Sequence, residues 1–527
     1  MNSITGVSLI GFAKGQEGGG ARPYDPSKRA FFGPEFAWAR PEEVASALQK
    51  AQDAAPIWAT LGHKPKADFL RLIAQGIEDN AARIIELATQ ETALPSGRIQ
   101  GEIGRTTGQL RLFAKLVEEG WWRDVRIDHS DPSRKPVPKP DVRSMLVPVG
   151  PVVVFSSSNF PLAFSVAGGD TASAFAAGCP VIVKAHQGHL ATSECVGNII
   201  VEAVRQSGLP EGSFSLLFGP GRSVGMALVT HPTIQAVGFT GSRSGGRALM
   251  DAAAARPRPI PVYAEMGSIN PMVILPGALT DRSQLLAAGL AGSVTLGNGQ
   301  FCTNPGLILL EAGPQTDAFL QQLGSELAKV APGAMLTESI CHEFLDGLSK
   351  FTELPEIAVH TKVEATPGQV GPILLTTSGQ YFLAQPALLE ELFGPATVAV
   401  LCNGIEEITK VVLALDGQLT GTIHASPEDY EQVKTLYPIL AGKVGRLVHN
   451  GFPTGVEVCH AMNHGGPYPA SADGRSTSVG TRAITRFARP LCWQNTPEFL
   501  LPEELKESNP LGLLRLVNGT WNKDLPE

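Results

Sequence analysis

The chain has 527 residues, of which 43% are hydrophobic and 17% are charged, and its formal net charge is −8. A chain of this length is expected to form two or three domains with sizeable cores. Acidic and basic residues are interspersed without a basic stripe, so the composition argues against a nucleic acid as the main partner.

Cysteine usage and hydropathy indicate a cytoplasmic protein. The seven cysteines are scattered, with no CxxC pair and no compact Cys/His cluster, which favours free thiols and predicts no metal site. The first residues, MNSITGVSLIGFAKGQEGGG, lack the charged and then apolar regions of a signal peptide. Since the sequence has no apolar run of about 18 residues, no membrane span is expected.

Periodicity predicts helices first and a mixed region afterwards. Residues 41–119 carry apolar positions at helical spacing, whereas residues 125–148 are short, extended and proline-rich, as in a projecting β-hairpin or arm. From residue 149, short apolar strands such as VGPVVVF and CPVIVKA alternate with helices. This alternation predicts a doubly wound, mostly parallel α/β sheet, which places ligands at the carboxyl ends of its strands.

A second alternating segment begins near residue 265 and continues to about residue 450. The following stretch, NGFPTGVEVCHAMNHGGPYPASADGRSTSVG, is rich in Gly, Pro and His but is not of low complexity. We expect it to be an ordered loop.

Cys302 is the candidate nucleophile. It lies in GNGQFCTNPG after a predicted helix, whereas the other cysteines lie mostly in apolar elements and are expected to be inert. A reactive thiol needs a base, and no histidine is near it in the sequence. Glu265, at the end of an apolar strand in YAEMGSINP, is the candidate base, because desolvation would raise its pKa toward neutrality. Its alternative is a surface or capping glutamate.

Other candidates follow strands of the first alternating region. Asn159 could donate a hydrogen bond to an oxyanion, or could be a plain turn residue. Lys184 ends a strand, where it could meet ribose or phosphate, or could be a surface lysine. FTGSRSGG places Thr240, Gly241, Ser242 and Gly246 in a turn between strand and helix, which is a weak dinucleotide signal without GxGxxG.

Taken together, these stretches resemble the NAD(P)-dependent aldehyde dehydrogenase superfamily. SNFP, VIVKAH, FTGS with Gly246, EMGSINP, GQFCT and ELFGP occur in the family order over roughly residues 30–495. The resemblance implies a Rossmann-like cofactor domain formed by residues 1–124 and 149–264, and a catalytic domain formed by residues 265–480. Residues 125–148 and 481–527 would form a β oligomerisation arm and C-terminal segment of a homodimer or homotetramer.

The resemblance also implies a mechanism. Cys302 would attack an aldehyde to form a thiohemiacetal, and the Asn159 side chain and Cys302 backbone N–H would stabilise the oxyanion. Hydride transfer would leave a thioester, which water activated by Glu265 would hydrolyse. Glu391 and Phe393 of ELFGP would hold the nicotinamide ribose and pack near its ring, and the glycines around Cys302 would leave room for that ring.

One departure from the family concerns the cofactor. The family commonly has a glutamate that binds the adenosine ribose, but here Lys184 is followed by Ala185, His186 and Gln187. Its loss removes repulsion against a 2′-phosphate, and Arg222 could bind that phosphate or could be a solvated loop charge. We therefore expect NADP to be preferred, with NAD possible. Ser268 replaces a second glycine after Glu265 and leaves the base intact.

Within the superfamily, KAHQGHLATSE and the 450–481 stretch resemble the α-ketoglutaric semialdehyde dehydrogenases, which oxidise 2,5-dioxopentanoate to 2-oxoglutarate. A fatty-aldehyde dehydrogenase is also similar there, so a fatty or medium-chain aldehyde is the alternative substrate. Candidate substrate-pocket residues are Phe160, Phe301 and His464, with Arg105 or Arg475 for a substrate carboxylate.

Two rival functions remain open at this point. A non-redox cysteine hydrolase or acyltransferase would need a histidine base and no nicotinamide site. A silent structural member of the fold would not need Asn159, Glu265 and Cys302, which are all present.

Overall fold

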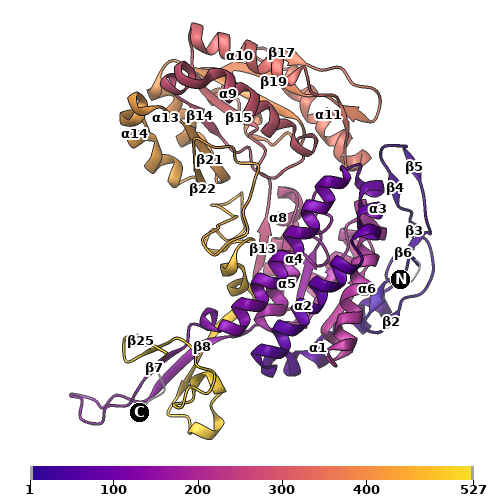
Figure 1. The fold of residues 1–527 in the computed structure, drawn as a ribbon, viewed down its shortest axis with the longest axis vertical. Helices are drawn as coiled ribbons and strands as arrows, with labels where there is room; N and C mark the ends of the chain where they lie inside the picture. Colours follow the sequence, from indigo (N-terminus) through magenta and orange to yellow (C-terminus); the bar gives the residue numbers. More distant parts are fainter. Residues whose placement is uncertain (1–3, 524–527) are drawn as a thin grey trace.

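The computed structural model describes residues 4–523 of the chain. Residues 1–3 and 524–527, which belong to the expected first and last segments, lie outside the described residues. Two seven-stranded sheets with flanking helices form the body, and a five-stranded arm extends from it (Figure 1). Among the described residues, no helix is long and apolar enough to cross a membrane.

The first sheet has the order β13-β12-β9-β10-β11-β1-β2, and its five strands from β13 to β11 are parallel. The strands are β13 (Val262–Glu265), β12 (Ala236–Thr240), β9 (Val152–Phe155), β10 (Val181–Lys184), β11 (Phe214–Leu217), β1 (Leu9–Ile10) and β2 (Ala13–Lys14). The helices are α1 (Pro41–Thr60), α2 (His63–Asp79), α3 (Ala81–Thr92), α4 (Ser96–Glu119), α5 (Gly169–Ala177), α6 (Leu190–Gln206), α7 (Met226–Thr230) and α8 (Arg243–Ala254). The central strands of this first sheet, β9, β10 and β11, are buried along their whole length, as expected for a parallel sheet covered on both faces.

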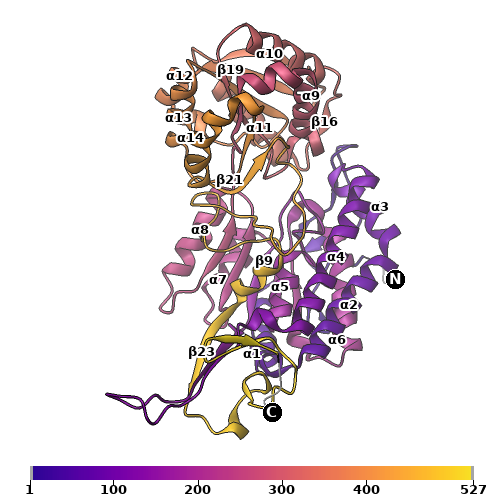
Figure 2. The ribbon, with the colours of Figure 1, turned by 60° about the vertical axis from the view of Figure 1, so that its left-hand side comes forward.

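Alternate residues of each strand enter different cores. Val152 and Val154 pack with apolar residues of α2, α4, α5 and α6, whereas Val153 and Phe155 pack with α1, α7 and α8. Because side chains alternate across a strand, helices cover both faces of the sheet (Figure 2). The predicted doubly wound architecture is confirmed.

The second sheet has the order β17-β19-β20-β15-β14-β21-β22 and is parallel except for β17. The strands are β17 (Ala358–Lys362), β19 (Ile373–Ser378), β20 (Ala396–Cys402), β15 (Leu307–Glu311), β14 (Met272–Ile274), β21 (Gln418–His424) and β22 (Val444–His449). The helices are α9 (Pro276–Thr295), α10 (Pro314–Leu327), α11 (Glu338–Thr352), α12 (Gly379–Ala384), α13 (Ile405–Ala414) and α14 (Tyr430–Ala441). Helices α9 and α10 cover one face, and α11 to α14 cover the other.

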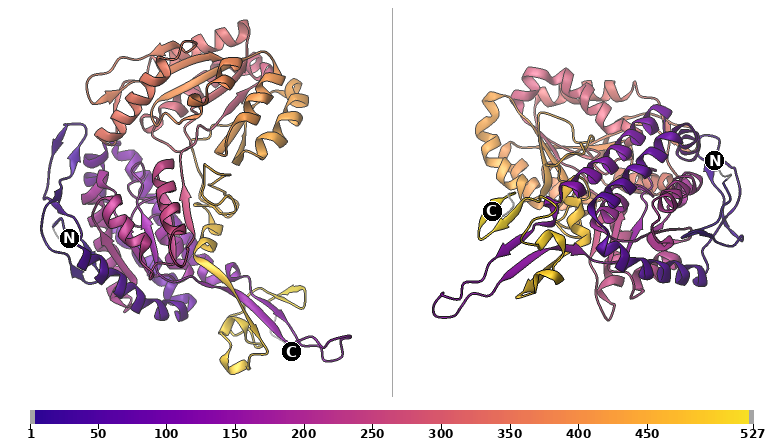
Figure 3. Two further views of the ribbon diagram at one scale, coloured as in Figure 1. Left: turned by 180° about the vertical axis from the view of Figure 1, so that it is seen from behind. Right: turned by 60° about the horizontal axis from the view of Figure 1, so that its bottom comes forward.

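The arm joins segments that are far apart in the sequence. Its order is β23-β8-β7-β24-β25, and β23 pairs with the whole length of β8 (Figure 3). The strands are β7 (Arg126–Asp128), β8 (Val142–Pro148), β23 (Ala488–Gln494), β24 (Arg515–Val517) and β25 (Thr520–Asn522). Two-residue strands form three small ladders: β3 (Gly20–Ala21) with β6 (Phe36–Ala37), β4 (Tyr24–Asp25) with β5 (Ala30–Phe31), and β16 (Gly333–Ala334) with β18 (Gln369–Val370).

The loop between β22 and β23 returns from the second sheet to the first. Ala472 N–H donates to Ala264 O at 2.9 Å, Met266 N–H donates to Ala470 O at 2.8 Å, and Glu265 forms a bridge with Ser471. The segment around residues 470–472 therefore runs along the end of β13. This pairing brings a late part of the chain to Glu265.

Candidate active site

Cys302 lies in a tight loop between α9 and β15. Gly297, Asn298 and Gly299 precede it with φ of 58°, 56° and 70°, in the left-handed region. A Cβ atom on Gly299 would overlap the carbonyl of Gly394, and one on Gly297 would meet the ring of Phe301. The turn and its packing therefore require these glycines. The expectation that they also leave room for a nicotinamide ring stays a prediction.

A buried asparagine holds the cysteine loop in place. The Asn270 amide nitrogen donates to the carbonyl oxygens of Cys302 at 2.8 Å and Asn304 at 2.9 Å. Its own carbonyl oxygen accepts from the Ser268 hydroxyl at 3.0 Å, and that hydroxyl also contacts Gln418 Oε1 at 2.9 Å. Sequence reasoning missed Asn270, although its position within EMGSINP was a signal. Ser268 is more than a neutral replacement, since it orients Asn270.

His464 bridges the thiol and the carboxylate. Its Nε2 lies 3.0 Å from Glu265 Oε2 and 3.5 Å from Cys302 Sγ. The His464 and Glu265 side chains are only 2% and 3% exposed. The loop that pairs with β13 carries the imidazole between these two groups and beside the Phe164 ring, and the prediction that His464 lines the substrate pocket stays a prediction. A histidine thus stands beside Cys302 despite the long sequence separation.

The pKa values of this cluster move in opposite directions. Burial raises the pKa of Cys302 well above its ordinary value, and the carboxylates of Glu265 and Glu391 add to the rise, against an opposing effect of Arg105. Burial alone would raise the pKa of Glu265, but the charge and hydrogen bond of His464 and the hydrogen bonds of Cys302 and Ser478 lower it overall. The expectation of a raised pKa for Glu265 is therefore wrong, since these partners stabilise its ionised form.

Asn159 approaches the same loop from the first sheet. It follows β9, and its amide nitrogen donates to Gln300 O at 3.1 Å. His189 Nε2 contacts Ser157 O at 2.7 Å and fixes the start of this turn. Among the described residues, the backbone N–H of Cys302 has no hydrogen-bond acceptor. An amide side chain and a free N–H beside a thiol are the donors that an oxyanion requires.

Asn159, Glu265 and Cys302 line a cleft of about 730 Å³ at the carboxyl ends of β9, β12 and β13. This is where a doubly wound sheet binds its ligands. The predicted site residues that line the cleft are Asn159, Thr240, Gly241, Ser242, Glu265, Cys302, Glu391 and Phe393.

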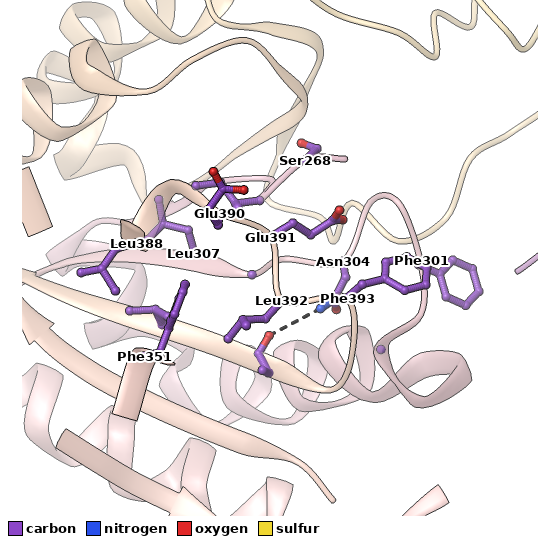
Figure 4. A pocket seen from close by; sticks show the side chains of 15 residues that line it. Ser268, Phe301, Asn304, Leu307, Phe351, Leu388, Glu390, Glu391, Leu392 and Phe393 are labelled. Atoms are coloured by element: carbon purple, nitrogen blue, oxygen red, sulfur yellow. Dashed lines mark hydrogen bonds between the residues drawn. The ribbon is translucent and has the colours of Figure 1, made fainter. Parts of the chain in front are cut away.

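Glu391 and Phe393 come from the segment before β20 and are tied to the cysteine loop. The Asn304 amide nitrogen donates to Gly394 O at 3.1 Å and to Ala396 O at 3.5 Å. Figure 4 shows Asn304 and Phe393 side by side, with Glu391 above them. Burial raises the pKa of Glu391 to about 8, although the backbone N–H of Ser268 opposes the rise. A positively polarised ligand group or hydroxyl donors would stabilise its ionised form.

Other predicted cofactor residues lie outside the lining of this cleft. Lys184 ends β10, and burial lowers its pKa to about 8. His186 accepts a hydrogen bond from Gly188 N–H at 3.0 Å and so caps the following turn. Gln187 and Arg222 are exposed. Gly246 allows close packing of α8, because a Cβ atom there would lie 2.6 Å from Met266 Sδ, and its predicted contact with the cofactor stays a prediction.

An aromatic cluster with two arginines adjoins the cysteine loop. Phe160 and Phe301 pack edge-on at 5.3 Å, and the Arg98 guanidinium lies 4.5 Å from the Phe160 ring centre. Arg105 lies 5.5 Å from the ring centre of Phe164. Sequence reasoning missed Arg98 and Phe164, which no motif singles out.

The structure distinguishes the two candidate arginines. Arg105 is partly buried, donates to Val456 O at 3.1 Å, and has an Nε with no partner in the described part of the chain. It lies near enough to Cys302 to affect the pKa of the thiol. The Arg475 side chain is 91% exposed and pairs with Asp473 at 2.9 Å, so its predicted place in the substrate pocket is corrected.

Comparison with known proteins agrees with this geometry. Residues 16–345 match the aldehyde dehydrogenase family. Alpha-ketoglutaric semialdehyde dehydrogenase 2 of Azospirillum brasilense is 51% identical over 520 residues, covering 98% of this chain and 99% of that protein. Alpha-ketoglutaric semialdehyde dehydrogenase of Acinetobacter baylyi is 45% identical over 499 residues, covering 93% of each.

A solved structure shares the fold at lower identity. Lactaldehyde dehydrogenase from Escherichia coli superposes with a TM-score of 0.80 at 20% identity, over 93% of this chain and 99% of that chain. The predicted fold is thus confirmed. The chain belongs to the aldehyde dehydrogenase family.

Proposed function

We propose that this protein oxidises 2,5-dioxopentanoate (α-ketoglutaric semialdehyde) to 2-oxoglutarate, with NADP as its preferred cofactor. The observation that carries the proposal is the meeting of Cys302, Asn159 and Glu265 in one cleft at the carboxyl ends of the first sheet. The two relatives described above, both named for this semialdehyde, support the choice of substrate.

Each residue near the reacting carbon has a distinct task. Cys302 Sγ attacks the aldehyde carbon, while the Asn159 amide and the Cys302 N–H donate to the oxygen that becomes negative. A nicotinamide cofactor bound in this cleft would supply the hydride acceptor for the oxidation, and Cys302 Sγ would hold the oxidised product as a thioester. Glu265 then takes a proton from the attacking water. Its Oε1 is buried without a hydrogen-bond partner among residues 4–523, and would therefore be free for that water.

Residues of the cleft suit a dinucleotide. Thr240, Gly241 and Ser242 end β12 and begin α8, where backbone N–H groups point toward a phosphate. Glu391 and Phe393 line the end of the cleft near Cys302, where they would hold the nicotinamide ribose and ring. Lys184, at the end of β10, would meet the adenosine side.

Arg105 supports an anionic substrate. A partly buried guanidinium near Cys302, with one N–H unpartnered, is suited to the carboxylate at the far end of 2,5-dioxopentanoate. The aromatic cluster around it would exclude water from the short carbon chain. A long-chain aldehyde would leave this charge without a partner.

A turnover panel tests the substrate. Initial rates are followed through absorbance of the reduced cofactor, for 2,5-dioxopentanoate, succinic semialdehyde, glutaraldehyde and a long-chain aldehyde with each cofactor. We expect the highest kcat/KM for 2,5-dioxopentanoate. A higher value for the long-chain aldehyde refutes the substrate, and ester hydrolysis without any cofactor reduction refutes the dehydrogenase activity.

The preference for NADP rests on Gln187 and Arg222. Arg222 is exposed and makes no ion pair within residues 4–523. Gln187 is uncharged, so this position has no carboxylate that would repel a 2′-phosphate. Arg222→Ala should reduce kcat/KM with NADP by about tenfold, because one charge-assisted contact is lost. The value of kcat/KM with NAD should change little. Arg205→Ala, on the exposed side of α6, is the control. A strong NAD preference of the unaltered protein contradicts the proposal.

The arm would join subunits. β25 presents the exposed Trp521 at the sheet edge, and Phe499 nearby in the chain is 82% exposed. Apolar groups of this size are expected to be covered in a homodimer or homotetramer. Sedimentation of the full chain tests this, and a monomer at micromolar concentration contradicts it.

A further inference from the structure

The imidazole of His464 faces the nucleophile, and the reaction outlined above gives it no task. We infer that His464 is a catalytic residue that accepts the proton of the Cys302 thiol and returns it when sulfur leaves the product. The inference rests on the proposed function for the role of Cys302 as nucleophile. Its physical basis is the placement of one ring nitrogen, Nε2, 3.5 Å from Sγ and 3.0 Å from Glu265 Oε2.

The two carboxylate oxygens of Glu265 have different surroundings, so that Glu265 and His464 can act as bases in different steps. Glu265 Oε2 contacts His464 and accepts a hydrogen bond from the Ser478 hydroxyl at 3.0 Å, whereas Oε1 has no hydrogen-bond partner in the described part of the chain. One oxygen therefore stabilises an imidazolium, and the other remains for a water molecule. The Ser478 hydroxyl also contacts His464 O at 3.1 Å, so one side chain aligns both groups.

The surroundings of Cys302 create the need for such a partner. The charged or titratable groups facing the thiol are His464, Glu265, Glu391, Arg105 and Arg446. Burial and the two carboxylates raise the pKa of Cys302 well above its ordinary value. Glu265 Oε2 is already engaged by His464 and the Ser478 hydroxyl, which leaves His464 Nε2 as the basic nitrogen in contact with sulfur. An imidazole in contact with sulfur can take the thiol proton and offset the two carboxylates.

The proton and electron pairs balance over the cycle. The step requires the neutral tautomer with hydrogen on Nδ1, so that the Nε2 lone pair can take the thiol proton, and the Glu265 carboxylate 3.0 Å from Nε2 then stabilises the imidazolium that forms. The S–H bond breaks as the Nε2–H bond forms, and the S–H electron pair forms the bond to the aldehyde carbon, whose π pair moves to oxygen. Once the carbon is at the thioester level, water attacks it and gives its proton to Glu265. The C–S bond then breaks, and sulfur regains the proton from Nε2.

Alkylation of Cys302 tests this step without aldehyde or cofactor. Iodoacetamide is added to the full-length protein over a range of pH, with a chelator present so that trace metal does not block the thiol. Mass spectrometry of the Cys302 peptide gives the rate of modification. His464→Phe keeps an aromatic ring and removes the base, and His464→Gln keeps a polar side chain that cannot take the proton.

Both variants should move the pH midpoint of alkylation up by about one unit or more, which corresponds to at least about tenfold slower modification at neutral pH. At high pH the rates should converge with that of the unaltered protein. Added imidazole should restore the neutral-pH rate of His464→Ala. His460→Phe, an exposed position in the same loop, is the control and should leave the midpoint unchanged.

An unchanged midpoint in both His464→Phe and His464→Gln overturns the inference. So does a midpoint that moves in Glu265→Gln but stays in the His464 variants, because the carboxylate is then the acceptor. Melting curves confirm that each variant is folded. Rescue of His464→Ala by added imidazole shows that the slower alkylation comes from the missing base and not from a disturbed fold. The alkylation assay contains neither substrate nor cofactor. Its result can therefore be interpreted even if the proposed dehydrogenase activity is not found.

Discussion

Replacement of Arg105 by Met tests how the protein selects a charged aldehyde. Methionine keeps a long unbranched stem that can cover Phe160 and Phe164, and it removes the guanidinium. A partly buried hydrogen bond to a carboxylate contributes about 1.5–3 kcal/mol, which corresponds to about a 10- to 150-fold change in kcat/KM. We therefore expect a loss in this range for 2,5-dioxopentanoate.

The assay compares that substrate with pentanal, which has the same number of carbon atoms and no charge. Arg105 also lowers the pKa of Cys302, so its removal affects the thiol as well as the substrate. An effect through the thiol reduces both rates equally, whereas loss of carboxylate binding reduces only the rate with the charged aldehyde. Arg475→Met, at an exposed arginine, is the matched control. Equal losses for both aldehydes, or no loss for either, refute the assignment.

Three further predictions concern the cleft and the cysteine loop. Asn159→Ala should lower kcat by about 100- to 1000-fold, because one oxyanion donor is lost, and a steady-state kcat within threefold of the unaltered protein contradicts this. Because burial holds the pKa of Glu391 at about 8, above its ordinary 4.5, its protonated form stabilises the fold at low pH, and this contribution is lost as pH rises from about 4.5 to 8. Glu391→Gln should therefore raise Tm at pH 8 and leave it nearly unchanged at pH 4.5; equal effects at both refute the assignment. Gly299→Ala should destabilise the protein by about 1–3 kcal/mol or more in urea unfolding, since φ is 70° and Cβ would overlap Gly394, while Gly292→Ala in α9, with open space around it, should be neutral or stabilising.

Much of the fold could be predicted from local patterns. The alternation of short apolar strands with helices predicted the doubly wound sheet, because a strand covered on both faces must be apolar along its whole length. The proline-rich hairpin at residues 125–148 was also visible. The resemblance grouped this hairpin with residues 481–527, but the register of its pairing with β23 was not visible, since strands separated by hundreds of residues leave no local trace of it.

The sequence by itself determined the candidate nucleophile, oxyanion donor and base, because each lies in a short motif whose order along the chain is characteristic. Only the tertiary structure decided how these groups affect one another. The pairing of residues 470–472 with β13 places His464 between Cys302 and Glu265, which reverses the expected direction of the Glu265 pKa shift. The tertiary structure also distinguishes Arg105, which is partly buried, from Arg475, which is exposed. Burial and nearby charges arise from packing and are not encoded in any single stretch of sequence.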